Sequence, residues 1–390
     1  MVKKIFKKVL PPTIRSYLRS FLRHLERTFI KDYFHTGRDK KVLISYIVAP
    51  FITSGLNSHT NFQECFGIAK IFDEMGYSID IIDYNSSYVP DYSKYSCVFG
   101  FGDPFCASFY HHVPGMVRIH YATGAHVHVQ NPETLKRAID TYKKKGQWLL
   151  SSCRIVKPTW SEQTTLSNAM IVLGNDWTRN TYAPYFDGHI YNLPTSYNAA
   201  LPQSILDVKD FDRVRKHYLW FGSAGAIHKG LDLVLDVFSQ HTDKTLHVAG
   251  LNNSEKEFMN SFHKELSLPN IIMHGFVDVS SPQYADLINN CAFVIMPSCA
   301  EAGCTSLVNS MCNGLIPVFT RQCGVDIKNY TLEIQDLSSS AVEDAVARCD
   351  ALDIATLRQM SNACRQDIRA TCSFEAFQNN INTILQKILS

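Results

Sequence analysis

The stretch IMPSCAEAGCTSLVNSMCNGLIPVFT, residues 295–320, contains a complete strand, loop, helix and second strand. An apolar run ends at Met296, a loop of small and polar residues carries Glu301, and a helical pattern begins near Thr305. Ligands of open α/β sheets bind beyond the carboxyl ends of the strands. A charged side chain in such a loop therefore marks a candidate binding site.

The same alternation of short apolar runs and helical patterns extends through the chain from residue 41 onward. Strands are predicted at 41–50, 78–84, 95–102, 116–124, 169–175, 217–223, 245–250, 271–277 and 292–298, and helices at 59–77, 132–146, 230–241, 281–290 and 373–390. Such alternation is typical of parallel sheets covered by helices. Because it occurs twice, we predict an α/β fold with two Rossmann-like, doubly wound parallel-sheet domains and a cleft between them.

The chain length of 390 residues favours two domains over a single core. A polar and charged stretch around 200–215 marks the boundary between them. We predict four parts, namely a basic amphipathic N-terminal segment at 1–38, Rossmann-like domains at 39–205 and 206–370, and a C-terminal helix at 371–390 that could pack back on the first domain.

The composition is that of a globular protein, with 45% hydrophobic and 19% charged residues. Twelve cysteines are present without any C-x-x-C spacing, so they are interpreted as reduced and mostly buried, which favours a cytoplasmic setting. No apolar run approaches the roughly 18 residues that a membrane span requires. The globular composition excludes a disordered chain, and the interpretation of the cysteines as reduced excludes a disulfide-framework protein.

The first 31 residues are strongly basic. They hold nine Lys or Arg and one Glu, a charge of +8, so the rest of the chain carries −6 to reach the total of +2. Arginines recur every fourth residue from Arg15 to Arg27, opposite an apolar helical face. This pattern predicts either contact with an anionic membrane surface or packing of the apolar face on the protein's own body. Nucleic-acid binding is not expected, because the basic charge is confined to one end and no reader motif occurs.

A second strand-to-helix turn lies in FGSAGAIHKGLDLVL, residues 221–235. Its small residues, Gly222 and Ser223 among them, let the backbone approach a ligand, and Lys229 can place a point charge on a phosphate. On its own, a Gly-rich turn favours a purely structural role over ligand binding.

The stretch that follows Glu301 has the features of an anion site. Free N–H groups where the helix begins near Thr305 favour a diphosphate, and the hydroxyls of Thr305 and Ser306 add donors. Glu301 can accept hydrogen bonds from sugar hydroxyls. The alternative is that Glu301 caps the helix or lies in solvent.

PSCAEAGCTSLVNSMCNGLIPV resembles the signature of family-4 glycosyltransferases (glycosyl transferases group 1) of the GT-B fold, and GSAGAIHKGLDLVLDVF resembles their Lys-Gly turn. The similarity covers residues 218–325 well, whereas the N-terminal half matches only in its pattern of strands and helices. It implies a retaining, metal-independent hexosyltransferase-like enzyme without cofactor. Its N-terminal domain would hold the acceptor, and its C-terminal domain a nucleotide diphosphate sugar.

The resemblance also implies roles for individual residues. Catalytic roles fall to Lys229 at the donor diphosphate, to Glu301 at the donor sugar and to His126 from the N-terminal domain. His111, His112, His120 and His128 are weaker candidates than His126. The donor would be bound by Gly55, Gly222, Ser223, Lys229, Gly275, Phe276, Val277, Glu301, Gly303, Cys304, Thr305, Ser306 and Asn309, with 275–277 against the base and 303–306 around phosphate.

Two positions depart from the family's pattern. Ser223 stands where an Arg precedes the Lys-Gly turn, and Asn309 replaces the second motif Glu that binds the ribose. A missing cation weakens stabilisation of the leaving group by roughly 3 kcal/mol. A catalytically weakened GT-B protein that binds a nucleotide sugar or a partner without turnover is therefore the alternative function.

The expected acceptor is a glycan or a lipid-linked molecule in surface polysaccharide or glycoconjugate synthesis, with the enzyme at the inner face of the membrane. Other glycan-processing classes lack their motifs. A glycosidase needs paired carboxylates, which cannot be assigned. The Asp-x-Asp triplet of a GT-A enzyme occurs only at 210–212, in the polar linker. An epimerase or phosphorylase has no distinguishing motif here.

Overall fold

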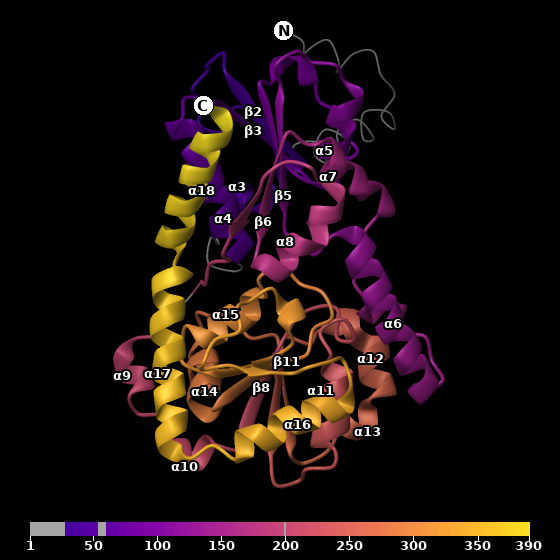
Figure 1. Cartoon of the computed structure of the whole chain (residues 1–390), viewed down its shortest axis with the longest axis vertical. Helices are drawn as coiled ribbons and strands as arrows, with labels where there is room; N and C mark the ends of the chain where they lie inside the picture. The colour runs from indigo at the N-terminus through magenta and orange to yellow at the C-terminus, as the bar shows by residue number, and fades with distance from the viewer. Residues whose placement is uncertain (1–27, 54–59, 199) are drawn as a thin grey trace, which may run out of the picture.

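The computed structural model of the chain describes residues 28–53, 60–198 and 200–390. It consists of two parallel-sheet domains stacked along the long axis of the molecule (Figure 1). This confirms the predicted α/β class and the two Rossmann-like sheets. The N-terminal segment expected to contact a membrane lies almost entirely outside the described residues.

The N-terminal sheet has seven strands in the order β1-β3-β2-β4-β5-β6-β7, with β1 antiparallel to β3 and the others parallel. The strands are β1 Phe29–Ile30, β2 Lys41–Tyr46, β3 Ser78–Asp83, β4 Cys97–Gly100, β5 Val117–Ala122, β6 Ala169–Leu173 and β7 Ile190–Leu193. Because β1 pairs with β3, the end of the segment that we assigned to 1–38 forms an edge of this sheet.

The C-terminal sheet has six parallel strands in the order β10-β9-β8-β11-β12-β13. They are β8 His217–Phe221, β9 Thr245–Ala249, β10 Ile271–Gly275, β11 Phe293–Met296, β12 Ile316–Phe319 and β13 Leu332–Glu333. All four side chains of the central strand β11 are buried. A strand covered on both faces is apolar throughout rather than alternating, which explains the continuous run in the sequence.

The α-helices cover both faces of the sheets (Figure 1). They are α3 Ala49–Ile52, α4 Thr60–Glu74, α5 Asp103–Ala107, α6 Val127–Lys145, α7 Glu162–Leu166, α8 Asp176–Tyr182, α9 Gln203–Leu206, α10 Phe211–Val214, α11 Leu231–Phe238, α12 Lys256–Ser261, α13 His263–Leu266, α14 Pro282–Asn290, α15 Thr305–Met311, α16 Ser339–Asp350, α17 Ile354–Thr371 and α18 Phe374–Leu389. In the described part of the chain, no helix has the length and apolar character needed to cross a membrane.

The last two helices connect the two domains. Helix α17 lies along the C-terminal domain, and α18 continues upward beside α4 of the N-terminal domain (Figure 1). Ser373 caps the start of α18 by accepting a hydrogen bond from the Ala376 N–H. The apolar face of α18 is part of the N-terminal core, through Phe377, Ile381, Ile384 and Leu385. The chain therefore returns to its first domain at its end.

Helix α6 makes the opposite crossing. It begins in the N-terminal domain and runs down beside the C-terminal domain (Figure 1). Arg137 on α6 forms a buried ion pair with Asp232 on α11, and Lys145 pairs with Glu265 at 2.5 Å. Leu149, just after the helix, belongs to the C-terminal core. Residues 127–157 are called the α6 arm below, and the part from Arg137 to Leu149 packs on the C-terminal domain.

We expect the Arg137–Asp232 pair to be a sensitive point of stability, because both side chains are at least 96% buried. Asp232→Leu removes the buried partner of the guanidinium and leaves it only the half-exposed Asp140 at 3.6 Å, so it should lower the free energy of unfolding by about 3–5 kcal/mol. The double variant Arg137→Met/Asp232→Leu should recover most of this loss. Urea denaturation measures both.

The matched control is Lys136→Gln, which breaks an exposed pair on the same helix. It should change the free energy of unfolding by less than about 1 kcal/mol. A cost for Asp232→Leu no larger than for this control would contradict the expectation.

Candidate active site

A cavity of about 870 Å³ lies between the two domains, at the carboxyl ends of both sheets. The N-terminal domain contributes residues after β2, β3, β4 and β5, and the C-terminal domain contributes the turn after β8 and the loop after β11. This is where an open α/β sheet binds its ligand. The α6 arm supplies residues 153–157 to the same cavity.

Lys229 is held by the turn between β8 and α11. Gly230 has a left-handed φ of 68°, and a Cβ there would lie 2.2 Å from the carbonyl oxygen of Pro297, so only glycine lets this turn pack on the loop after β11. The indole Nε1 of Trp220 donates to the Lys229 carbonyl at 3.2 Å. The backbone that carries the ammonium group is therefore fixed.

Glu301 lies opposite Lys229, and its carboxylate accepts a hydrogen bond from the Lys229 ammonium group. Ser298 Oγ donates to the same oxygen at 3.2 Å, and the Glu301 N–H donates to the Gln322 carbonyl at 2.8 Å. Burial alone would raise the pKa of Glu301, but Lys229 and Arg154 act against it and lower the pKa to about 2. The carboxylate is ionised at any physiological pH.

Arg154 also belongs to this cluster, although it was not among the residues predicted from the sequence. Its Nη1 lies 3.2 Å from Glu301 Oε2, and its side chain remains half exposed to the cavity. The α6 arm positions it, since Gln130 Nε2 donates to the Arg154 carbonyl at 3.0 Å. The Arg154 stem lies over Gly225, where a Cβ would come within 2.9 Å of its Cγ. The stretch SSCRIVKP, residues 151–158, contains no motif that predicts this contact, because Glu301 lies 147 residues after Arg154 in the chain.

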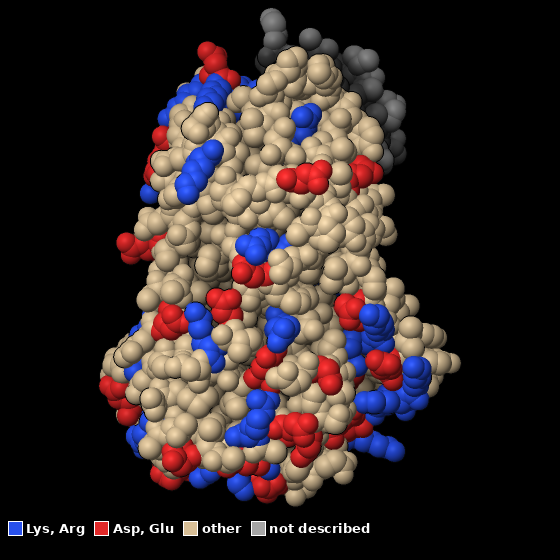
Figure 2. Space-filling view, in the orientation of Figure 1, with Lys and Arg blue, Asp and Glu red and all other residues tan. Residues whose placement is uncertain are grey.

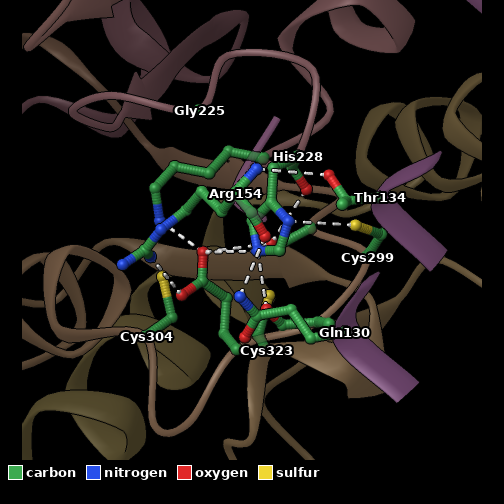
Figure 3. Close-up of polar contacts among 12 residues, drawn as sticks. Gln130, Thr134, Arg154, Gly225, His228, Cys299, Cys304 and Cys323 are labelled. Atoms are coloured by element: carbon green, nitrogen blue, oxygen red, sulfur yellow. Dashed lines mark hydrogen bonds and ion pairs between the residues drawn. The ribbon is translucent and has the colours of Figure 1, made fainter. Parts of the chain in front are cut away.

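His228 and Cys299 make further buried polar contacts beside this cluster (Figure 3). His228 Nδ1 lies 3.3 Å from Cys299 Sγ, and its Nε2 lies 2.6 Å from the Ala300 carbonyl oxygen. Burial lowers the pKa of His228 to about 4, so the ring is neutral near pH 7. A hydrogen bond with Cys323 lowers the pKa of the Cys304 thiol, which lines the cavity.

His126 caps the start of α6 at the cavity wall. Its Nδ1 accepts a hydrogen bond from the His128 N–H at 3.3 Å, and its ring stacks on Tyr185 at 4.1 Å. Burial lowers its pKa to about 4, so the ring is neutral and carries its proton on Nε2. That Nε2 is buried and has no hydrogen-bond partner within the described residues.

Asn309 lines the cavity but uses its amide for the protein itself. Its Oδ1 accepts from the Asn198 N–H at 2.8 Å, and its Nδ2 donates to the Thr305 carbonyl at 3.0 Å. One turn later, Asn313 Oδ1 accepts from the Leu201 N–H at 2.8 Å. The two amides attach the interdomain linker to α15, a role that the sequence-based interpretation of Asn309 did not include.

The other predicted site residues are distributed around this cluster. The cavity is also lined by Gly222, Ser223, Phe276, Val277, Gly303, Cys304, Thr305 and Ser306. Gly275 does not line the cavity, but its carbonyl accepts a hydrogen bond from the N–H of Gly250, which does line it. Gly55 lies outside the described residues. Of the other histidines considered, His120 lines the cavity in a buried position, whereas His111, His112 and His128 do not line it.

The turn and loop that carry this cluster fall within a sequence match. Residues 211–327, which include Lys229 and Glu301, match the model of the family described as Glycosyl transferases group 1. Most of the C-terminal domain is therefore similar to this family. The predicted resemblance of residues 218–325 to glycosyl transferases group 1 is confirmed by this match. No curated protein matches the chain in sequence.

Solved structures share the fold of the whole chain at low sequence identity. Sucrose-phosphate synthase from Thermosynechococcus elongatus has a TM-score of 0.59 at 11% identity, covering 90% of this chain and 99% of its own. Anabaena HepE in complex with UDP and glucose has a TM-score of 0.56 at 10% identity, covering 89% and 99%. These similarities confirm the GT-B fold.

A TarM mutant from S. aureus, in complex with fondaparinux, α-GlcNAc-glycerol and UDP, covers 77% of this chain with a TM-score of 0.53 and 14% identity. This chain spans only 57% of the length of that protein. Within the described residues, no group of three or more His, Cys, Asp or Glu is placed to hold a metal ion.

Glu64 is the second carboxyl group in the cavity. It lies on α4 and accepts a hydrogen bond from Ser196 Oγ at 3.0 Å. Burial raises its pKa from 4.5 to about 7, against the effect of the Ser196 hydrogen bonds. The folded protein therefore keeps this proton in a pH range where the unfolded chain has lost it.

We expect a specific contribution of Glu64 to the pH dependence of stability. Its stabilising effect is complete below pH 4.5 and is lost as the pH rises to about 7, a change of about 3 kcal/mol. Glu64→Gln should remove this component from the profile of unfolding free energy against pH. Glu74→Gln, at an exposed site on the same helix, should leave the profile as in wild type. Identical profiles for Glu64→Gln and wild type would contradict the assignment.

Proposed function

We propose that this protein is a retaining glycosyltransferase that moves a sugar from a nucleotide diphosphate sugar to a hydroxyl of a glycan or lipid-linked acceptor. The observation that carries the proposal is the cluster of Lys229, Arg154 and Glu301 in the cavity between the two domains. Two cations with one carboxylate leave a net charge of +1, which suits a diphosphate.

The diphosphate of the donor would bind beside Lys229 and Arg154, which now share Glu301. Arg154 would replace the cation that is missing at Ser223. It comes from the α6 arm rather than from the Lys-Gly turn. The base would lie against Phe276, whose side chain is 72% exposed. The loop Gly303–Ser306 lines the cavity beside the phosphates in this arrangement.

The donor sugar would lie between Glu301 and His126. Glu301 accepts hydrogen bonds from sugar hydroxyls, and the Nε2–H of His126 is a donor without a partner in the described part of the chain. A buried donor of this kind costs free energy until a ligand satisfies it. Its presence at the cavity wall supports a role in binding a polar group of the sugar.

The chemistry follows from these placements. The bond from the anomeric carbon to the diphosphate breaks while the acceptor oxygen attacks the same face, and the acceptor proton passes to an oxygen of the leaving diphosphate. Lys229 and Arg154 stabilise the charge that develops on the diphosphate, at about 3 kcal/mol for each donor. Enclosure of the donor between the domains excludes water that would hydrolyse it.

The setting of the reaction belongs to the same proposal. We place the enzyme in surface polysaccharide or glycoconjugate synthesis, cytoplasmic and peripheral at the inner face of the membrane, independent of a metal. The charge of +8 over residues 1–31 supports contact with anionic lipid.

A chain that lacks residues 1–27 should lose its partition to anionic vesicles, because most of this charge is then absent. Co-sedimentation measures the partition, with neutral vesicles as the control. Unchanged partition would refute the membrane contact.

The activity is tested by release of nucleoside diphosphate from a panel of UDP-, GDP- and dTDP-sugars. We expect release from one donor, accelerated by an acceptor. Lys229→Met and Arg154→Met should each lower kcat by about 10²–10³. Arg213→Met, at an exposed site outside the cavity, should match wild type. No loss with Arg154→Met would remove this residue from the mechanism.

The second candidate function is a GT-B protein that binds a nucleotide sugar without turnover. The engagement of both ends of the Asn309 amide by the protein favours it, because one acceptor site of Oδ1 and one of the two N–H donors are already used, which leaves fewer groups for the ribose. Tight donor binding without release of nucleoside diphosphate, in the same panel, would establish this function in place of transfer. The variant Asn309→Glu in the same assay shows whether the amide limits turnover.

A further inference from the structure

The part of the cavity formed by the N-terminal domain is a bowl of four aromatic rings, called the aromatic bowl below. Tyr46, Tyr84, Phe101 and Trp160 all line the cavity, and Phe101 contacts the other three rings. The ring centroids of Phe101 lie 5.4 Å from Tyr46, 5.2 Å from Tyr84 and 5.9 Å from Trp160. Tyr84, Phe101 and Trp160 are only half-buried, so part of each ring faces the open cavity.

Hydrogen bonds hold the bowl in place. Asp103, at the start of α5, accepts from Trp160 Nε1 at 2.9 Å and from Lys157 Nζ at 2.6 Å. Gln163 Oε1 accepts from the Gly102 N–H at 2.9 Å, which fixes the backbone between Phe101 and Asp103. An arrangement of rings fixed without ligand is preorganised, so a ligand does not have to order it.

The charges around the bowl favour a neutral ligand. Among the described residues that line the cavity, the acidic side chains are Glu64 and Glu301, and the Lys and Arg side chains are Lys157, Arg154 and Lys229. Lys157, the cation at the bowl, forms a neutral pair with Asp103, whereas Arg154 and Lys229 belong to the separate cluster around Glu301. The bowl thus lacks an unpaired cation for an anionic acceptor.

The bowl suits a sugar ring in particular. A pyranose presents a face of C–H groups, which packs on an aromatic ring, and a rim of hydroxyls, which needs hydrogen-bond partners. Asn85 and Lys157 are exposed lining residues and can supply such partners. A purely apolar chain would leave their polar groups unused.

The bowl lies within reach of Lys229, Arg154 and Glu301, called the donor cluster below. Residues 153–157 line the cavity continuously, with Arg154 at Glu301 and Lys157 at the bowl. Three residues of extended chain span at most about 11 Å. One or two sugar rings bridge that separation, so a ring in the bowl can place a hydroxyl of its own or of its neighbour at the donor sugar.

We propose that the aromatic bowl is an acceptor subsite for a neutral sugar ring. The inference rests on the proposed function, which it deepens by naming the acceptor class. Two sources share this chemistry, a free oligosaccharide and the sugar part of a lipid-linked one.

Saturation-transfer NMR on the full chain tests the proposal with maltotriose, cellotriose and chitotriose as neutral probes and glucose 6-phosphate as the anionic one. We expect one or more neutral probes to bind, with the strongest transfer to ring C–H protons. Trp160→Ala should weaken that binding at least about tenfold. The binding of UDP, GDP or dTDP should change by less than about twofold, because Trp160 is not part of the donor cluster.

Tyr84→Leu is the second variant and should weaken saccharide binding in the same direction. Trp148→Ala is the matched control, since Trp148 stacks on Tyr142 outside the cavity. The affinity of an oligosaccharide is then measured in its free form and as the headgroup of a lipid in vesicles. Equal affinity for the two forms would show that the sugar alone is recognised. Tighter binding in vesicles assigns part of it to the lipid and still supports the subsite.

Three results would overturn the subsite: no neutral saccharide binds, only glucose 6-phosphate binds, or Trp160→Ala weakens the nucleotide as much as the saccharide. Failure of the proposed function looks different. In that case neutral saccharides bind and depend on Trp160, while no nucleotide sugar is turned over.

Discussion

The carboxylate of Glu301 between Lys229 and Arg154 is the constraint on which the cavity depends. A buried carboxylate is costly unless its charge is matched, and removal of one partner from such a pair costs about 3–5 kcal/mol. Here the three charges come from three separate parts of the chain: the turn after β8, the loop after β11, and the α6 arm. Their mutual requirement fixes these three segments against one another at the point where the ligand would bind.

The α/β alternation and the two residues Lys229 and Glu301 could be predicted because each is encoded locally. A strand, a turn with glycine and a helix follow one another within about 15 residues, so the carboxyl end of a strand can be read from the sequence. The same holds for Gly222 and for the loop from Gly303, which all line the cavity. Local order in the chain was sufficient for that half of the site.

The rest of the site depends on contacts between distant segments. Before the Lys-Gly turn the sequence has Ser223 in place of a second cation. The guanidinium that contacts Glu301 belongs to Arg154, which lies 147 residues before Glu301 in the chain. Asn309 was interpreted from its place in a motif, but its amide is used by Asn198 in the linker. Tyr84 follows β3, Phe101 follows β4, and Trp160 lies within η4 (Pro158–Ser161), so the three rings meet only through the tertiary fold.

The two crossings of the chain have a consequence for how such a protein can be divided. The α6 arm, from the first half of the sequence, covers Asp232 of the second domain, and α18, from the end of the sequence, completes the core of the first. The two folding units are therefore interlocked by exchange of one element each, and a cut at the linker would leave both with an uncovered surface. Any rearrangement that joins the N-terminal domain of one such protein to the C-terminal domain of another has to keep both exchanged elements with the domain that they cover. Recombination is therefore constrained at the α6 arm and at α18 as well as at the linker.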